Sequence, residues 1–125
     1  MSYSEKMYIS KKLIDDFACF SGDYSPIHVD EEFAKNTQFK RCIAHGAILE
    51  ANISKILGMK YPGPGTIYVS QQCKFIKPVY IGDEVEFRIT KKMVDNKGRL
   101  VLETNCFVDD QIVMKGEAVV IPQEI

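Results

Sequence analysis

Residues 44–57, which read AHGAILEANISKIL, decide the fold of this chain. The segment is the longest helical candidate in the sequence, and it is apolar on almost every side. Its apolar residues are Ala47, Ile48, Leu49, Ala51, Ile53, Ile56 and Leu57. A helix that is apolar all round is buried by the rest of the protein. The sequence therefore predicts a central helix that other elements surround.

Small residues recur along one face of this predicted helix. Ala47, Ala51, Ser54 and Gly58 follow one another at spacings of 4, 3 and 4 residues, which places them on the same side. Small side chains let a backbone or a substrate approach closely, and ordinary packing of a helix on a sheet requires them as well. Both uses of this face remain open from the sequence.

The part of the chain after the turn at 62–65 (PGPG) has the pattern of strands. Four stretches are rich in Val, Ile, Phe, Tyr and Thr and partly alternate between apolar and polar residues. These are Thr66–Phe75, Glu84–Val94, Arg99–Val108 and Ile112–Ile121. Turn-forming residues at 95–98 and 109–111 predict that the last three form an antiparallel meander. A short strand is also predicted at Met7–Ile9.

The N-terminal part of the chain has the pattern of helices. Ser10 is the predicted N-cap of a helix over Lys11–Phe20, and a short helix is predicted over Asp30–Asn36. Helices followed by a sheet, with one apolar helix for that sheet to wrap, predict an α+β fold. We expect one domain over residues 1–125, with an antiparallel sheet wrapped around the long central helix.

Composition and charge exclude several classes of protein. Of the 125 residues, 46% are hydrophobic and 26% are charged, as in ordinary globular proteins. The formal net charge of −1 produces no long-range field for nucleic acid or for an anionic membrane. No apolar run approaches the roughly 20 residues of a membrane span, and no signal-peptide pattern occurs at the N-terminus. We therefore expect a cytoplasmic protein that binds neither nucleic acid nor membranes.

Four cysteines lie at wide and unequal spacings, at positions 19, 42, 73 and 106. No C-x-x-C pair occurs, and neither histidine lies at zinc-site spacing from two cysteines. We expect free thiols in a reducing compartment, and the sequence implies neither a metal nor another cofactor.

Residues 20–30, FSGDYSPIHVD, are the most informative for chemistry. They place the carboxylate of Asp23 five residues before the imidazole of His28, in a segment predicted to be a non-helical loop. A rigid loop can point both side chains at one spot. A carboxylate and an imidazole together can take a proton from water and return one elsewhere, as adding water to a double bond requires. Spacing alone does not separate this role from that of an ordinary helix cap.

The segment GDYSPIH at 22–28 resembles the hydratase signature of MaoC-like proteins and (R)-specific enoyl-CoA hydratases. Three further blocks resemble the same family in the same order, so the similarity extends over roughly residues 13–121. They are residues 43–47 (IAHGA), 62–68 (PGPGTIY) and 75–83 (FIKPVYIGD). One position departs from the family pattern, because Ser25 stands where the signature usually has Asn. The change bears on the positioning of the loop more than on the acid–base pair.

The resemblance implies a homodimer of hot-dog subunits that acts on trans-2-enoyl thioesters of coenzyme A or of acyl carrier protein. In that family picture Asp23 and His28 are catalytic and hold the water that adds to the β-carbon. Which of them is the acid and which the base is left open. The direction of the reaction is open as well, because hydration and the dehydration of a 3-hydroxyacyl thioester share one transition state.

Four other residues are candidates for the site. Gly46, at the start of the central helix, has an N–H free to stabilise a thioester carbonyl, although a tight turn before a helix also favours glycine. His45 is a second candidate base, or it binds a backbone group. Ser54 is expected to bond Asp23, unless its hydroxyl bonds back to the helix. Ser25 is the fourth, through its place in the loop.

Two rival functions remain. A hot-dog thioesterase often carries an acidic residue on the central helix, where this chain has Glu50; we expect instead that Glu50 pairs with Lys55 or with a lysine of a partner subunit. A non-catalytic thioester-binding module is the second rival. Lys40, Arg41 and Lys77 are the basic residues that either contact phosphates or are simply solvated.

Overall fold

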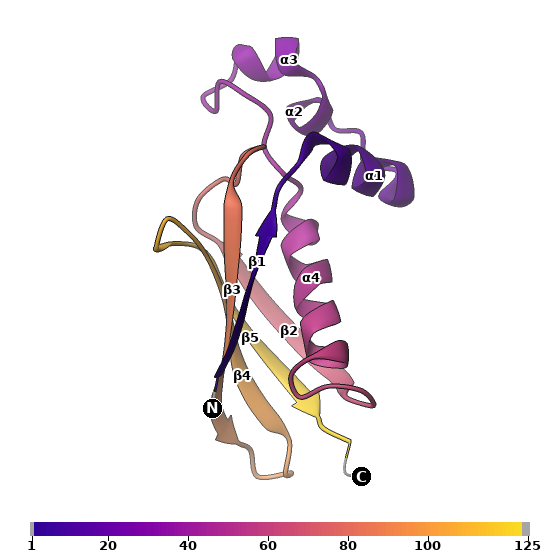
Figure 1. Cartoon of the computed structure of the whole chain (residues 1–125), viewed down its shortest axis with the longest axis vertical. Helices are drawn as coiled ribbons and strands as arrows, with labels where there is room; N and C mark the ends of the chain where they lie inside the picture. Colours follow the sequence, from indigo (N-terminus) through magenta and orange to yellow (C-terminus); the bar gives the residue numbers. More distant parts are fainter. Residues whose placement is uncertain (1, 124–125) are drawn as a thin grey trace.

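The computed structural model describes residues 2–123 and consists of a five-stranded antiparallel sheet with one long helix against it (Figure 1). The strands lie in the order β1-β3-β4-β5-β2. Three shorter helices gather beyond one end of the sheet. The elements are β1 (Ser2–Tyr8), α1 (Lys11–Ser21), α2 (Pro26–Val29), α3 (Glu31–Lys35), α4 (Gly46–Met59), β2 (Ile67–Phe75), β3 (Glu84–Val94), β4 (Leu100–Val108) and β5 (Gln111–Ile121). The predicted α+β class and the hot-dog arrangement are confirmed.

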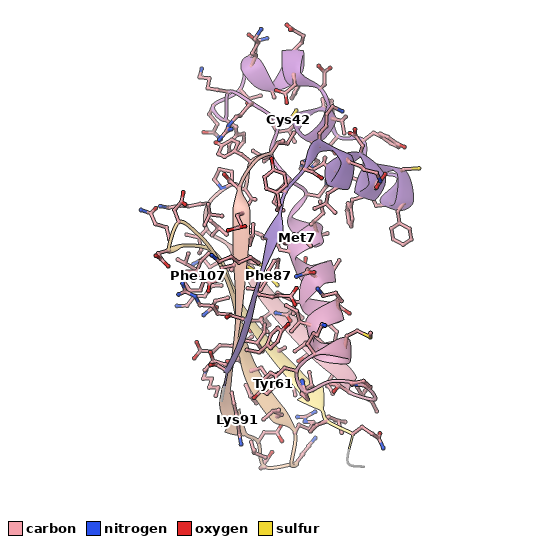
Figure 2. The ribbon with its side chains drawn as sticks, viewed as in Figure 1. Met7, Cys42, Tyr61, Phe87, Lys91 and Phe107 are labelled. Carbon is pink, nitrogen blue, oxygen red and sulfur yellow. The ribbon has the colours of Figure 1, made fainter. Side chains whose placement is uncertain are left out.

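One face of α4 packs on the inner face of the sheet. The buried helix residues include Ile48, Leu49, Ile53, Ile56 and Leu57. Alternate residues of β3 meet them, because side chains two apart on a strand point to the same side. Val85, Phe87 and Ile89 are fully buried there, and Phe87 is labelled near the middle of the sheet in Figure 2.

In the described part of the chain, no helix is both long and apolar enough to cross a membrane.

The opposite face of α4 is exposed in this chain. Ala47, Ala51 and Ser54 are exposed, and Gly58 is half-buried. The prediction of a helix buried on every side is therefore wrong for one chain by itself. These small residues do not pack on the sheet, because the larger residues of the other face occupy it.

The strand predictions are confirmed for the meander, which runs β3-β4-β5 with antiparallel pairing. The two edge strands of the sheet are β1, which pairs with β3, and β2, which pairs with β5. The first strand is longer than the predicted Met7–Ile9. Its sequence SYSEKMY lacks the apolar alternation that marks a strand, yet its burial still alternates residue by residue.

A polar network explains how β1 can point Glu5 inward. Glu5 accepts hydrogen bonds from the hydroxyl of Tyr3 (2.8 Å), the amide of Asn52 (3.1 Å) and the ammonium group of Lys55 (2.6 Å). Partial burial raises the pKa of this carboxyl group, but the hydrogen bonds from Lys55, Tyr3 and Asn52 outweigh it, so the net pKa is lowered. These hydrogen bonds hold the edge strand β1 against α4.

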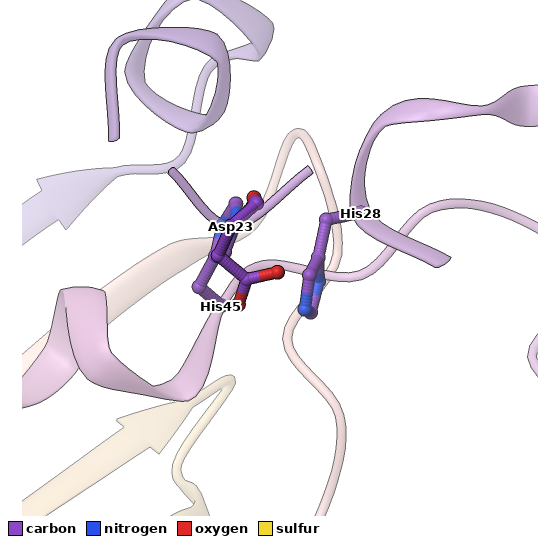
Figure 3. Close-up of side chains that lie close together, drawn as sticks. All are labelled: Asp23, His28 and His45. Carbon is purple, nitrogen blue, oxygen red and sulfur yellow. The ribbon is translucent and has the colours of Figure 1, made fainter. Parts of the chain in front are cut away.

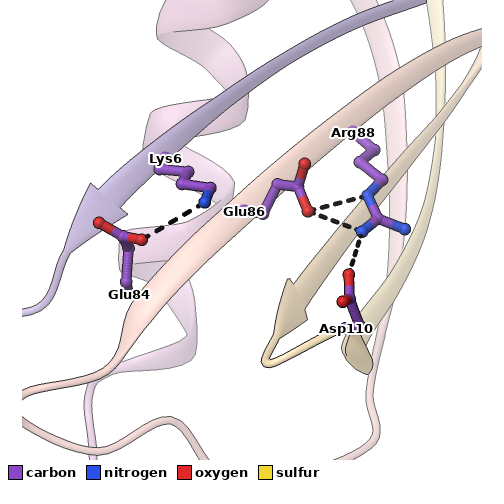
Figure 4. A network of polar contacts seen from close by, with 5 residues as sticks. All are labelled: Lys6, Glu84, Glu86, Arg88 and Asp110. Carbon is purple, nitrogen blue, oxygen red and sulfur yellow. Dashed lines mark hydrogen bonds and ion pairs between the residues drawn. The ribbon is translucent and has the colours of Figure 1, made fainter.

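Ion pairs link strands on the other face of the sheet (Figure 4). Lys6 on β1 pairs with Glu84 on β3 at 3.6 Å. Arg88 contacts Glu86 at 2.7 Å and Asp110 at 2.9 Å. The exposed fractions of these side chains range from 27% for Glu86 to 89% for Asp110, and ion pairs open to solvent contribute only about 0–1 kcal/mol. The sheet therefore depends on its apolar inner face.

We predict that Glu5→Gln lowers the free energy of unfolding by about 1–2 kcal/mol at pH 7, because hydrogen bonds to a charged group are stronger than neutral ones. A carboxyl group whose pKa is lowered in the folded state stabilises the protein above its unfolded pKa and loses that contribution as the pH falls through the folded value. The difference between the variant and the wild type should therefore shrink below the ordinary value of 4.5. Urea unfolding at fixed protein concentration measures both effects.

The matched control for this measurement is Glu32→Gln. Glu32 contacts Lys35 at 3.6 Å in an ion pair whose side chains are 86% and 68% exposed. We expect no measurable change in its unfolding free energy. An equal loss in the two variants would show that the Glu5 network has no special role.

Candidate active site

The end of α1 builds the loop that carries Asp23. Gly22 adopts a left-handed conformation (φ 79°), which glycine tolerates without steric cost, and its N–H bonds the carbonyl of Ala18 at 2.8 Å. The hydroxyl of Ser21 donates to the carbonyl of Phe17 at 2.7 Å and accepts from the N–H of Asp23 at 3.1 Å. These bonds fix the backbone of Asp23 to the helix that precedes it.

Ser25 holds the side chain of Asp23. Oδ1 of the carboxylate accepts a bond from the Ser25 hydroxyl (2.5 Å) and another from the Ser25 N–H (3.0 Å). The hydroxyl bond and then the N–H bond lower the pKa of Asp23 below its ordinary value of 3.8, and the nearby His28 and His45 add to that direction. Asp23 is therefore a carboxylate at neutral pH, and Ser25 supplies the turn that follows it.

His28 lies on α2, a single helical turn, so the prediction of a non-helical loop is wrong at this residue. Pro26 opens the turn because its fixed φ suits the first helical position and its missing N–H is not needed there. Nδ1 of His28 lies 2.8 Å from the carbonyl oxygen of Ile43. Only an N–H can donate to a carbonyl, so Nδ1 carries a proton and Nε2 is the nitrogen available for chemistry.

His45 is buried at the N-cap position of α4 and contacts both predicted catalytic residues. Its exposed fraction is 2%, and its Nε2 lies 2.9 Å from the backbone carbonyl of Asp23. Its ring stacks on that of His28 with centroids 4.0 Å apart, and the tilted ring of Phe17 lies on it at 4.9 Å. Nε2 donates its proton to the carbonyl, which leaves Nδ1 as a buried nitrogen without a partner among residues 2–123.

Asp23, His28 and His45 form one compact group (Figure 3). One carboxylate oxygen and one nitrogen of each ring all lie within 4.8 Å of one another, and the carboxylate points toward His28. A water molecule with hydrogen bonds of about 2.8 Å can bridge two atoms at such a separation. The structure therefore brings the carboxylate and the imidazole to one spot, as the sequence pattern predicts.

The two rings do not form a good metal site. Their planes are tilted by only 24°. The lone pair of an imidazole nitrogen lies in the plane of its ring, so two nearly parallel rings cannot both point at one ion about 2.0–2.1 Å away. The donor types fit a metal, but their directions do not.

A cavity of about 500 Å³ opens beside the group, between the start of α4 and the end of β2. Its lining residues are His28, Phe39, Ile43, Ala44, His45, Gly46, Ala47, Leu49, Glu50, Phe75, Ile76, Lys77, Pro78 and Val79. Gly46 lies in its wall, where a Cβ atom would come within 2.7 Å of the Phe75 ring. A side chain at this position would therefore push Phe75 into the cavity.

The structure does not bring two other residues to their expected partners. Ser54 is exposed on α4 and lines no part of the cavity, so no bond joins it to Asp23 among residues 2–123. The predicted pairing of Glu50 with Lys55 is wrong, because Lys55 pairs with Glu5 on β1. Glu50 instead lines the cavity.

The sequence does not indicate how some residues of the site contribute to it. The carbonyl of Ile43 orients His28, but any residue supplies a carbonyl. Phe75 and Lys77 line the cavity from a block that resembled the family, although nothing in that block indicates contact with the helix. Arg41 stacks over Tyr80 at 4.1 Å, which gives this candidate phosphate contact another partner.

The chain is similar in sequence and in fold to several known proteins. The family model for the MaoC like domain matches residues 1–110. The chain is 44% identical to the (R)-specific enoyl-CoA hydratase of Rhodospirillum rubrum, over 90% of this chain and 78% of that protein. It is 41% identical to the 3-hydroxybutyryl-CoA dehydratase of Methylorubrum extorquens, over 92% and 74%. The solved (R)-hydratase of Aeromonas caviae matches with a TM-score of 0.93 and 32% identity, over 98% and 95% of the two chains.

We predict that Ser25→Ala raises the pKa of Asp23 toward 3.8, because the variant loses the hydroxyl bond and keeps only the backbone one. Carbon-13 NMR titration of the carboxyl groups measures this value directly. In the wild type the Asp23 resonance should titrate below 3.8. An unchanged titration in the variant would show that the Ser25 hydroxyl does not hold the carboxylate.

Proposed function

Because this chain belongs to the MaoC-like family, we propose that it is an (R)-specific enoyl-CoA hydratase. It adds water reversibly to a trans-2-enoyl-CoA and forms the (R)-3-hydroxyacyl-CoA, so it is a hydro-lyase. The observation that carries the proposal is the approach of Asp23 and His28 to within reach of one shared water. The relatives from Rhodospirillum rubrum and Methylorubrum extorquens bear the names of this reaction in its two directions.

In this mechanism each of the two catalytic residues carries out one proton transfer. Asp23 is ionised, so it takes a proton from the bound water while the water oxygen bonds to the β-carbon. In this step His28 begins with a proton on each ring nitrogen: Nδ1 keeps its bond to the Ile43 carbonyl, and Nε2 gives its proton to the α-carbon. The O–H bond of the water, the Nε2–H bond of His28 and the π bond between the α- and β-carbons break, while an O–H bond on Asp23, a C–O bond and a C–H bond form. The proton on Asp23 returns to His28 through solvent, which restores the pair.

Gly46 stabilises the charge that develops on the thioester carbonyl. Its N–H is at the first position of α4, where it has no partner within the helix and lies at the positive end of the helix dipole. One such donor contributes about 3–4 kcal/mol to the stability of a transition state. The close approach of Phe75 excludes any side chain here, which keeps the N–H open to the cavity.

His45 is a positioning residue in this proposal. It holds the backbone of Asp23 through one bond and supports the face of the His28 ring by stacking. Its Nε2 is committed to the Asp23 carbonyl, and its buried Nδ1 has no hydrogen-bond partner among residues 2–123. His28 is therefore the ring that transfers the proton in this proposal.

The carrier in this proposal is coenzyme A. The relatives at 41–44% identity bear coenzyme A in their names, whereas a mitochondrial relative from Arabidopsis thaliana at 33% is named for acyl carrier protein. Lys77 lines the cavity next to Phe39 and Pro78, where an anionic carrier would approach. The four free cysteines accord with the expected cytoplasmic location.

A second copy of the chain covers the exposed edge of the sheet in the proposed homodimer. β2 is an edge strand with exposed apolar side chains, among them Ile67 (56%) and Val69 (41%). An apolar edge strand exposes backbone N–H and C=O groups that can pair with a strand of another chain. The exposed small residues Ala47 and Ala51 lie on the neighbouring α4, where a second helix can approach closely.

We predict that the chain hydrates crotonyl-CoA, with loss of the enoyl-thioester absorbance and an intact thioester. Asp23→Asn should lower kcat by about 10²–10⁴-fold, as expected for removal of a general base. Asp16→Asn is the matched control, because Asp16 is an exposed aspartate paired only with Lys12. His45→Gln keeps a donor but loses the stacked ring, and it should lower kcat more than it changes KM.

Product analysis decides between the candidate functions. An (R)-3-hydroxy product supports the hydratase. Release of free coenzyme A that survives in Asp23→Asn would instead favour a thioesterase that uses Glu50. Binding of the thioester without turnover would favour the non-catalytic module.

We predict a mass of about twice the 14.2 kDa of one chain in light scattering after size exclusion. Val69→Lys should shift the protein toward the monomer, because it places a charge on the β2 edge. Val94→Lys is the control, since Val94 is a valine on β3 that is exposed to 51%, against 41% for Val69. A monomeric wild type would contradict the proposed dimer.

A further inference from the structure

The cavity is lined by one basic and one acidic side chain. Lys77 lies in the segment that follows β2, two residues beyond Phe75. Glu50 lies on α4, one helical turn further along than Gly46. Most of the other lining residues are apolar, with Leu49 and Phe75 among them. A ligand that fills the cavity therefore meets both an ammonium group and a carboxyl group.

Glu50 has no cation to balance it among residues 2–123. The nearest lysine on its helix, Lys55, pairs with Glu5. The groups around Glu50 are the neutral side chains of Tyr68 and Cys73. Burial first, and then the negative charge of Glu50, raises the pKa of the Cys73 thiol to about 11, so the thiol is neutral at pH 7. The Glu50 carboxyl group thus accepts a hydrogen bond from the Cys73 thiol but has no cation beside it among residues 2–123, and it is half-buried.

Charge sets the direction in which a thioester of coenzyme A lies in this cavity. The carrier bears several phosphate charges, so it is repelled by Glu50 and attracted to Lys77. The acyl chain then points from Gly46 toward Glu50. A long alkyl tail would displace water from the carboxylate without replacing its hydrogen bonds, and that desolvation is unfavourable.

We propose that Glu50 determines the acyl-chain specificity of this site and restricts it to short chains such as the four-carbon crotonyl group. The inference rests on the proposed hydratase function. Glu50 also lines a second hollow of about 280 Å³, together with Tyr68, Val69, Ser70 and Gln71. Glu50 thus lines both spaces. A longer chain that extended from the cavity into this hollow would have to pass its side chain.

The test compares kcat/KM for trans-2-octenoyl-CoA and crotonyl-CoA in the wild type and in two variants. The wild type should strongly favour crotonyl-CoA. Glu50→Ala should raise the octenoyl-to-crotonyl ratio by at least about tenfold, since one methylene in an apolar pocket changes specificity by roughly 10–200-fold. Glu50→Gln has the same shape without the charge, so it should give a smaller increase that separates charge from size. Glu103→Ala is the control, because Glu103 is an exposed carboxylate on β4 that lines no part of this cavity.

The outcomes separate the inference from the function on which it rests. A wild type that hydrates octenoyl-CoA as well as crotonyl-CoA would overturn the role of Glu50 and leave the hydratase in place. An unchanged ratio in Glu50→Ala, with hydration of crotonyl-CoA retained, would do the same. Failure of the wild type to hydrate either thioester would instead count against the proposed function. Thermal melting of each variant shows whether the protein is folded.

Discussion

The packing of α4 on the inner face of the sheet is the interaction on which the rest of the structure depends. It buries one side of the helix and thereby fixes where the helix begins. That beginning carries His45 and Gly46, and the end of β2 brings Phe75 against the glycine. The loop that carries Asp23 lies outside the sheet. It is held by the end of α1, by the bond from His45 to the backbone of Asp23 and, through α2, by the bond from His28 to the Ile43 carbonyl.

The chemistry of the site follows from unequal constraints on three polar side chains. Ser25 lowers the pKa of Asp23, Ile43 fixes the Nδ1 proton of His28, and the buried Nδ1 of His45 has no partner among residues 2–123. In the proposed mechanism these contacts distinguish the base from the acid. Glu50 likewise has no cation beside it, so in its proposed role it places a polar group in a mainly apolar cavity and limits the length of the acyl chain.

Local patterns were enough to predict much of this architecture. Alternation and turn residues predict β3, β4 and β5, and Ser10 caps α1 as expected. The errors have physical causes. β1 was predicted too short because it turns Glu5 inward, and only contacts with the distant Asn52 and Lys55 make that favourable. The contact of His28 with His45 depends on how α2 meets α4, which no spacing in the sequence encodes. A half-exposed α4 was not foreseen, because an apolar sequence does not tell whether a sheet or another chain covers it.

The order of the strands has a consequence for synthesis. β1 pairs with β3, and β2 pairs with β5, so each edge strand precedes its partner in the chain. During translation the chain emerges from the ribosome with its N-terminus first, at about 5–20 residues per second. The apolar helix α4 therefore emerges several seconds before the meander that covers it. During that interval the apolar face of α4 has no sheet to pack on, and the sheet closes on its helix only when the C-terminal strand has left the exit tunnel.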